Sequence, residues 1–156
     1  MSKIELNDFL VHAFHDILLV EERCLRGAGH QDLSIREVHL IDAVCLAVES
    51  GSDNRVTAIA RQLGVTNGTL TVAVNALEKK GYLSRQRNRK DRRVVEIIPT
   101  EKAKAARHWH AAFHEAMVDA VENVLGEEEL EALAHALAAI QAYFKKQNHE
   151  IKLGGI

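Results

Sequence analysis

The sequence predicts a mostly α-helical fold with a single β-hairpin, in which a compact centre lies between long N- and C-terminal helices. Apolar residues make up 47% of the 156 residues, which is enough to fill a core, and Pro99 is the single proline. Proline breaks helix interiors, so its scarcity favours helices. Two β-prone segments around a polar tip supply the hairpin.

The N-terminal part of the chain is expected to form two helices. Apolar side chains recur at helical spacing over residues 4–26, and "GAG" at 27–29 ends the pattern. A second helix is expected at about residues 35–49, because Ser34 is followed three residues later by Glu37 in a capping-box pattern. The polar stretch "SGSDN" stops this second helix.

The segment "VTAIARQLGVTNGTLTVAVNALEKKGYL" predicts a helix-turn-helix, with the tight turn at Gly64. Thr66 is the expected N-cap of the second short helix, which ends near residue 81. Leu70, Val74 and Leu77 share one face of this helix and are expected to pack inward. The opposite face is small and polar apart from a valine at position 72.

The C-terminal part of the chain is expected to contain the hairpin and two more helices. "YLSRQR" and "RVVEIIP" flank the polar tip "NRKD". A helix is expected from residues 100–101 to about 125, and a last helix after Gly126 repeats Leu130, Leu133, Leu137, Ile140 and Phe144 at heptad-like steps. The terminal helices carry more apolar stripes than the centre can cover, which favours a homodimer over packing within one chain.

The outward face of the second short helix suits the major groove of DNA. Asn75 can read adenine through two hydrogen bonds, and threonine methyl groups can touch thymine methyl groups. The N-terminus of the helix favours a phosphate. The DNA contacts expected from this helix are Thr66, Asn67, Gly68, Thr69, Thr71, Val72, Asn75 and Lys79.

The positive charge of the chain is concentrated in the hairpin. "RQRNRKDRR" at 85–93 has six basic residues and one acid, a formal charge of +5, which leaves −7 for the rest of a chain whose total is −2. A charge run is often only a solvated surface. Directly after a helix-turn-helix it predicts contacts with a minor groove or with phosphates. The expected contacts are Arg85, Arg87, Arg89, Lys90, Arg92 and Arg93.

With these motifs, the chain resembles the MarR family of winged-helix repressors over essentially its whole length. The matching features are "VTNGTLTVAVNALEKKGYL", the wing "DRRVVEI" and the helix entry "PTEKAKA". Many family members carry a basic residue where this chain has Val72. The resemblance implies a homodimer that binds an inverted repeat in double-stranded DNA, with residues 35–99 as the winged helix-turn-helix and residues 1–34 and 100–156 as the dimerisation region.

Within that family, "FLVHAFHDILLVEERCLRG", "DLSIREVHLIDAV" and "FHEAMV" resemble the FabT-like repressors of fatty-acid synthesis genes. The co-repressor of that branch is a long-chain acyl group on acyl carrier protein. The resemblance implies an acyl tunnel lined by apolar residues and two arginines that meet the acidic carrier protein. The implied apolar residues are Phe14, Leu18, Val38, Ile41, Phe113 and Met117, and the implied arginines are Arg26 and Arg36. Each apolar position would also suit ordinary core packing.

The histidines indicate a second kind of effector. His110 and His114 are spaced i, i+4, which places two imidazoles on one helix face. A zinc-sensing branch of the MarR family uses such a pair together with a glutamate and a histidine from earlier helices. The matching residues are Glu21 or Glu22, and His39. The alternative is a set of polar groups that hydrogen-bond in a pocket floor.

The sequence argues against an enzyme and for a cytoplasmic regulator that requires no cofactor. It has no nucleophile elbow, phosphate loop or HExxH pattern. Two cysteines are too few for a disulfide framework, and the N-terminus lacks the pattern of a signal peptide. We therefore interpret the sequence as that of a repressor controlled by acylated carrier protein, and the alternative is a metal-responsive regulator with zinc as effector.

Overall fold

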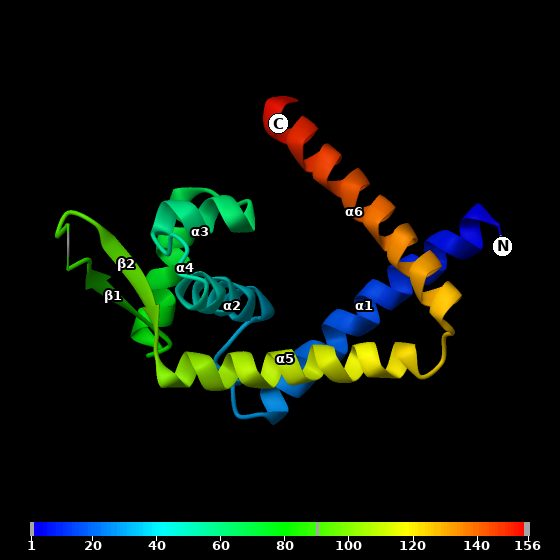
Figure 1. Cartoon of the computed structure of the whole chain (residues 1–156), viewed down its shortest axis with the longest axis horizontal. Coiled ribbons are helices and arrows are strands. Elements are labelled where there is room, and N and C mark those ends of the chain that lie inside the picture. Colours follow the sequence, from blue (N-terminus) through cyan, green and yellow to red (C-terminus); the bar gives the residue numbers. More distant parts are fainter. Residues whose placement is uncertain (1, 90, 155–156) are drawn as a thin grey trace. The chain divides into compact units, whose positions relative to one another are not determined.

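The computed structural model describes residues 2–89 and 91–154, with side chains as far as residue 148. Over these residues the chain forms helices and one antiparallel hairpin, as the sequence predicts (Figure 1). The elements are α1 (Lys3–Gly27), α2 (Ile35–Glu49), α3 (Val56–Leu63), α4 (Asn67–Lys79), β1 (Leu83–Arg87), β2 (Val95–Pro99), α5 (Glu101–Glu122) and α6 (Glu127–Gly154). α5 ends three residues before the expected position.

Local capping signals set the helix boundaries. The Ser34 hydroxyl accepts the Glu37 backbone N–H, and the Glu37 carboxylate accepts the Ser34 backbone N–H, which confirms the predicted capping box. Gly64 ends α3 with φ 69°, a left-handed conformation that favours glycine. Thr66 caps α4 by accepting the Thr69 backbone N–H, as predicted.

The chain divides into two compact units, Met1–Phe113 and His114–Ile156, so that α5 begins in the first unit and ends in the second. The hydrophobic core belongs to the first unit. It is built from α2, α3, α4, the hairpin and the start of α5, and it includes Leu25 of α1. Its largest fully buried side chains include Tyr82, Ile41, Ile59 and Leu77.

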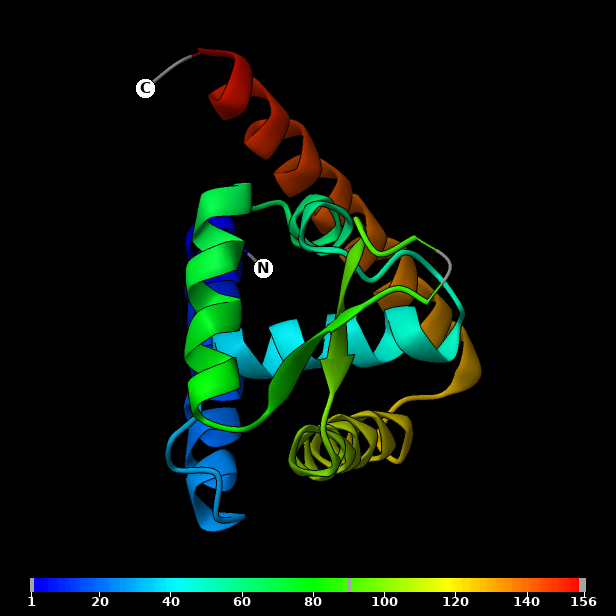
Figure 2. The same ribbon diagram turned by 90° about the vertical axis from the view of Figure 1, so that its left-hand side faces the viewer.

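The hairpin packs on this core. Its register pairs Leu83 with Pro99 and Arg87 with Val95. Ile97 of β2 is fully buried, and β2 packs on α2, which crosses behind the hairpin in Figure 2. Pro99 sits at the end of β2, where the lost N–H does not interrupt the ladder. The wing therefore projects from a fixed base.

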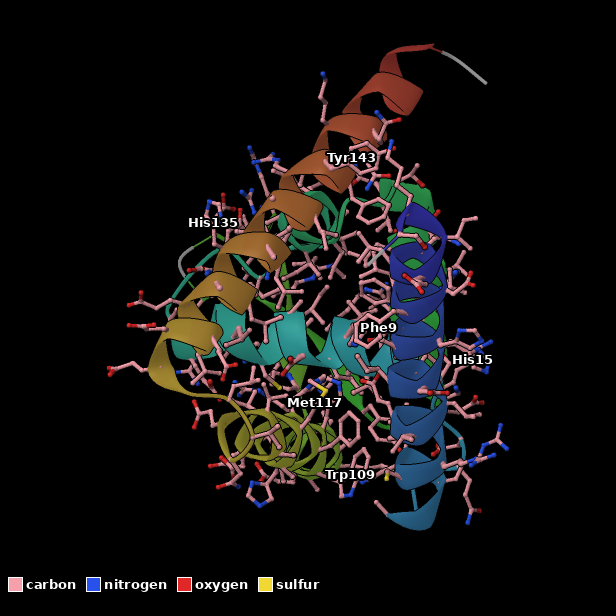
Figure 3. All side chains as sticks on the ribbon, turned by 90° about the vertical axis from the view of Figure 1, so that its right-hand side faces the viewer. Phe9, His15, Trp109, Met117, His135 and Tyr143 are labelled. Carbon is pink, nitrogen blue, oxygen red and sulfur yellow. The ribbon has the colours of Figure 1, made fainter. Side chains whose placement is uncertain are left out.

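The long helices expose apolar side chains. On α1, Phe9, Phe14 and Leu18 are 48–66% exposed. Phe9 and His15 project from different sides of this helix (Figure 3). Trp109 of α5, by contrast, is partly buried and packs against the core. On α6, Leu137 and Phe144 are about half exposed. No helix among the described residues combines the length and hydropathy needed to cross a membrane.

Candidate nucleic-acid interface

The second helix of the helix-turn-helix presents the predicted face to solvent. Leu70, Val74 and Leu77 are buried, as expected from the helical spacing. The eight residues expected to contact DNA from this helix and its cap are all exposed. Among the residues that the structure describes, the Asn75 amide has no hydrogen-bond partner. α4 therefore offers an accessible polar surface with an amide available for a base.

The N-terminus of α4 is organised by threonine hydroxyl groups. The Thr66 hydroxyl lies 2.9 Å from that of Thr69 and accepts the Thr69 backbone N–H at 3.1 Å. The Thr71 hydroxyl donates to the Asn67 carbonyl at 2.7 Å. These local bonds fix the first turn, and helix N-termini of this kind favour phosphate oxygens.

The wing carries four arginines that pair with no carboxylate among the described residues. Arg87, Arg89, Arg92 and Arg93 are exposed, and their guanidinium groups form no ion pair within the described residues. Arg87, Arg89 and Arg92 line two adjoining hollows, together with Gln86, Asn88 and Glu96. Lys90, also expected to contact DNA, lies outside the described residues. The unpaired cations make the wing a strongly electropositive surface.

Arg85 differs from the other wing arginines, because it forms an ion pair with Glu78 of α4. Both side chains are about 70% buried, with 29% and 28% of their surface exposed. The pair links β1 to the C-terminal end of α4, the recognition helix of the helix-turn-helix. Arg85 therefore positions the wing, although it stands among the predicted DNA contacts.

The tip of the wing is shaped by polar side chains that are not among the predicted site residues. Asn88 donates to Glu96 across the hairpin at 2.6 Å and accepts the Asp91 backbone N–H at 3.2 Å. Asp91 accepts the Arg93 backbone N–H at 3.0 Å. The signal was present in the sequence as Asn and Asp in a turn, since both residue types bond nearby backbone groups.

A polar network joins the recognition helix to the rest of the first unit. Asp32 accepts a hydrogen bond from the Tyr82 hydroxyl at 2.8 Å and lies 3.3 Å from the Lys102 ammonium, and Lys80 pairs with Glu37 at 2.7 Å. Burial alone would raise the pKa of Asp32 and of Glu37, but these hydrogen bonds outweigh it and lower both pKa values. Burial, with Asp32, raises the pKa of Tyr82. The network ties the end of α4 to the starts of α2 and α5.

The residues of α1 and α2 that are expected to line an acyl tunnel do not form one surface. Val38 and Ile41 are fully buried in the core, whereas Phe14 and Leu18 are about half exposed on α1. An acyl chain would reach Val38 and Ile41 only if the core opened. Phe113 stacks on Trp109 with 6.3 Å between ring centroids, and Met117 is half-buried in the second unit. Of the two arginines, Arg26 pairs with Glu22 at 2.6 Å.

Arg36 lies instead at an apolar groove between α2, the α3–α4 turn and α4. The groove has a volume of about 350 Å³. Its lining residues are Arg36, His39, Leu40, Leu63, Val65, Thr69, Leu70 and Ala73. The other residues expected to meet an acyl chain or its carrier are not among them.

Glu21, His39 and His110 meet at the junction of α1, α2 and α5. The Glu21 carboxylate is 2% exposed, and its Oε1 atom lies 2.6 Å from His110 Nε2 and 3.6 Å from His39 Nε2. His110 is also buried, and its ring centroid lies 5.3 Å from that of His39. His114 follows one helical turn later, as the first residue of the second unit. Glu22 is exposed and pairs with Arg26, so Glu21 is the acid in this cluster.

These three residues suit a metal ion chemically. Tetrahedral zinc with bonds of about 2.0–2.1 Å places its ligand atoms about 3.3 Å apart. The Glu21–His39 distance is close to that value, whereas Glu21 and His110 are at hydrogen-bond distance. The cluster is therefore arranged as a hydrogen-bonded set in which Glu21 and His110 are buried and His39 is exposed.

The helix-turn-helix and the wing with its exposed arginines define the class of this protein: it is a winged-helix protein of the DNA-binding type. Comparison with known proteins is consistent with this class. A model of the MarR family matches residues 45–95. The structure of Streptococcus pneumoniae FabT in complex with DNA is similar over 94% of this chain and 99% of that chain, with 33% identity and a TM-score of 0.82. The chain belongs to the MarR family of transcriptional regulators.

Two further relatives are more distant or shorter in extent. The regulator SarZ of Staphylococcus haemolyticus is 36% identical over 58 residues, which are 37% of this chain and 40% of SarZ. The chain thus spans about two fifths of the length of this curated relative. S. aureus MepR bound to ethidium bromide shares the fold at 17% identity, with a TM-score of 0.66 over 92% of this chain and 97% of MepR. The relatives are regulators rather than enzymes, in agreement with the sequence.

Proposed function

We propose that this protein is a homodimeric transcription repressor that places α4 in the major groove of duplex DNA and the wing beside it. The observation that carries the proposal is the set of four exposed wing arginines that form no ion pair within the described residues, on a hairpin whose strand β1 packs against α4. Phosphate contacts position a protein on DNA, and base contacts specify the sequence. The arginines supply the first kind of contact, and Asn75 supplies the second by pairing with adenine.

The exposed apolar residues of α1 and α6 support the homodimer. Phe9, Phe14 and Leu18 on α1, and Leu137 and Phe144 on α6, would be costly to leave in water. A second copy of the chain offers the same apolar helices, and a twofold interface is self-complementary. A dimer presents two recognition helices, which matches an inverted-repeat operator with half-sites about one helical turn apart.

Substitutions in the wing test the proposal that this protein binds DNA. A double variant, Arg92→Ala with Arg93→Ala, should weaken binding to operator and random DNA alike and reduce the salt dependence by about one counterion per lost contact. Fluorescence anisotropy over a range of salt concentrations measures this slope. The control removes two cations that already pair on the helices, through Arg26→Ala with Lys104→Ala. An unchanged slope in the wing variant would show that these arginines do not meet phosphates.

We further propose that the protein controls fatty-acid synthesis genes, with a long-chain acyl group on acyl carrier protein as co-repressor. The similarity to FabT supports this proposal. Arg36 carries a charge that would suit the acidic carrier protein, since it is exposed and no ion pair engages it within the described residues. The acyl chain would occupy apolar surface next to α1 and α5, where Leu18 and Phe113 lie.

The second candidate is a metal-responsive repressor, and the Glu21–His39–His110 cluster favours it. Two imidazoles and one carboxylate are a common zinc ligand set. If zinc is the effector, these side chains would hold it, and the ion would add positive charge at the junction of α1, α2 and α5. His114 is the predicted fourth ligand.

One titration separates the two effectors. Operator affinity is measured with carrier protein bearing acyl chains of increasing length, and then with zinc and with chelator. An acyl effector should raise affinity with chain length, because each buried methylene contributes about 0.8 kcal/mol. A metal effector should make binding sensitive to chelator, and His39→Ala with His110→Ala should remove that sensitivity. Chelator sensitivity without an acyl response would refute the fatty-acid proposal and support the metal site.

A further inference from the structure

An apolar side chain stands in the centre of the polar face of α4. Gly68, Val72, Asn75 and Lys79 are spaced by four, three and four residues, so they form one stripe along the helix. All four are exposed, and Val72 is 69% exposed. Single apolar residues are common on protein surfaces. Val72 differs from such residues because it lies on the stripe that the proposed function brings into the DNA groove.

The described residues of the first unit give this valine no packing role. The side chain lies outside the hydrophobic core, whose α4 members are Leu70, Val74 and Leu77. Valine is also a weaker helix former than alanine, because the preceding turn restricts its side chain. The major groove of DNA offers one apolar feature, the C5-methyl group of thymine. A valine would be desolvated against that methyl group.

Gly68, one turn before Val72, gives a second and independent indication. Its backbone has ordinary helical geometry, and a Cβ atom there would meet nothing closer than the Thr66 hydroxyl at 3.9 Å. The fold therefore does not require glycine, which costs up to about 1 kcal/mol relative to alanine inside a helix. Glycine is useful where a backbone must approach a ligand closely. DNA against this stripe is such a ligand.

We propose that Val72 determines operator specificity by contacting the C5-methyl group of a thymine in each half-site, and that Gly68 lets α4 sit deep enough for this contact. Val72 and Asn75 are three residues apart, about 4.5 Å along the helix axis. Base pairs are spaced about 3.4 Å apart. The thymine should therefore lie within one or two base pairs of the adenine that Asn75 bonds. This inference rests on the proposed insertion of α4 into the major groove.

The experiment removes only the methyl group. An operator is first selected from random duplex DNA with the full-length protein, and each thymine is then replaced in turn by deoxyuridine. For the wild type, one thymine in each half-site should cost about fourfold in affinity, the effect of one buried methyl group. Val72→Ala should bind the unmodified operator more weakly and lose no further affinity with deoxyuridine at that position.

Two further variants serve as controls. Val72→Thr keeps the branched shape with one methyl group and should retain part of the sensitivity to deoxyuridine. Gly68→Ala should raise the thermal stability of the protein and yet weaken operator binding, a combination that a purely structural role would not give. A deoxyuridine effect that persists unchanged in Val72→Ala, or that disappears in Thr71→Ser instead, would overturn the inference. Failure of the wild type to select any DNA would overturn the proposed function itself.

Discussion

At the scale of single residues, the ion pair of Glu37 and Lys80 links local and long-range structure. Glu37 caps α2 through Ser34, and its carboxylate also accepts hydrogen bonds from the Lys80 ammonium at the end of α4. Both side chains are partly buried, with exposed fractions of 16% and 32%. One carboxylate therefore fixes both the start of α2 and the far end of the recognition helix.

The lowered pKa of Glu37 predicts a specific pH dependence. A carboxyl group with a depressed folded-state pKa stabilises the fold above its unfolded pKa, and this stability is lost as the pH falls through the folded-state value. The free energy of unfolding should thus decrease as the pH drops below 4.5, the ordinary pKa of this side chain. Glu37→Gln should cost about 1 kcal/mol at neutral pH and make the decline in that acidic range shallower. Urea unfolding at pH values between about 3 and 7 measures both effects.

The matched control for this prediction is Glu128→Gln, which changes an exposed acid in the first turn of α6. It should leave the pH dependence of the wild type intact. A Glu37→Gln variant with the full acidic decline would mean that another carboxyl group carries the effect. Asp32 would then be the first group to test, because its pKa is lowered in the same network.

At the scale of elements, the wing depends on a residue outside the hairpin. Asn54, in the loop between α2 and α3, is 9% exposed. Its side-chain amide donates to the Ile97 carbonyl at 2.9 Å, and the backbone carbonyl of Asn54 accepts the Ile97 backbone N–H at 3.1 Å. The loop thus holds β2 by one side-chain and one backbone hydrogen bond, and it anchors β2 to the helix-turn-helix.

Asn54→Ala should therefore loosen the base of the wing. Removing the amide leaves the buried Ile97 carbonyl with one partner fewer, which should cost about 1–3 kcal/mol in the free energy of unfolding. The salt-dependent part of DNA binding should weaken as the wing arginines lose their fixed position. Chemical unfolding and hydrogen exchange at the β2 amides measure these effects. Ser52→Ala, an exposed change in the same loop, is the control, and equal losses in both variants would contradict the role of Asn54.

The helix boundaries and the exposed face of α4 could be predicted from the sequence, whereas the contacts between distant residues could not. The boundaries of α2, α3 and α4 follow from signals within a few residues, such as the Ser34–Glu37 box and Gly64. The exposed face of α4 follows from helical period alone. The contacts of Tyr82 with Asp32, and of Asn54 with Ile97, join residues 50 and 43 positions apart. No local pattern encodes such contacts.

Two predicted site residues illustrate the same limit. Arg85 belongs to the basic run by sequence, but its position in β1 brings it to Glu78 of α4. The resulting ion pair holds the wing against α4. Val38 fits a tunnel by helical spacing, but the same spacing is satisfied by core packing, and the structure places it in the core. Charge and hydropathy identify the kind of residue a site needs, and three-dimensional packing decides which of these residues remain available.

At the scale of the whole molecule, assembly is the property on which the proposed function depends. A single recognition helix reads one short stretch of DNA, and affinity for a long operator comes from two linked contacts. The apolar residues of α1 and α6 are the surfaces that a second chain would cover. Dimer formation and operator affinity should therefore fail together.

Charged substitutions on α6 test this coupling. Leu137→Glu with Phe144→Glu places carboxylates on side chains that are 49% and 54% exposed, so a folded chain tolerates them while an apolar interface does not. Sedimentation should then give the 17.4 kDa mass of one chain rather than twice that mass. Circular dichroism should remain helical, and the footprint on the operator should shrink to one half-site. His135→Glu, which adds one charge at an exposed position of the same helix, should stay dimeric with a full footprint. A double variant that still sediments as a dimer and protects both half-sites would place the interface elsewhere on the chain.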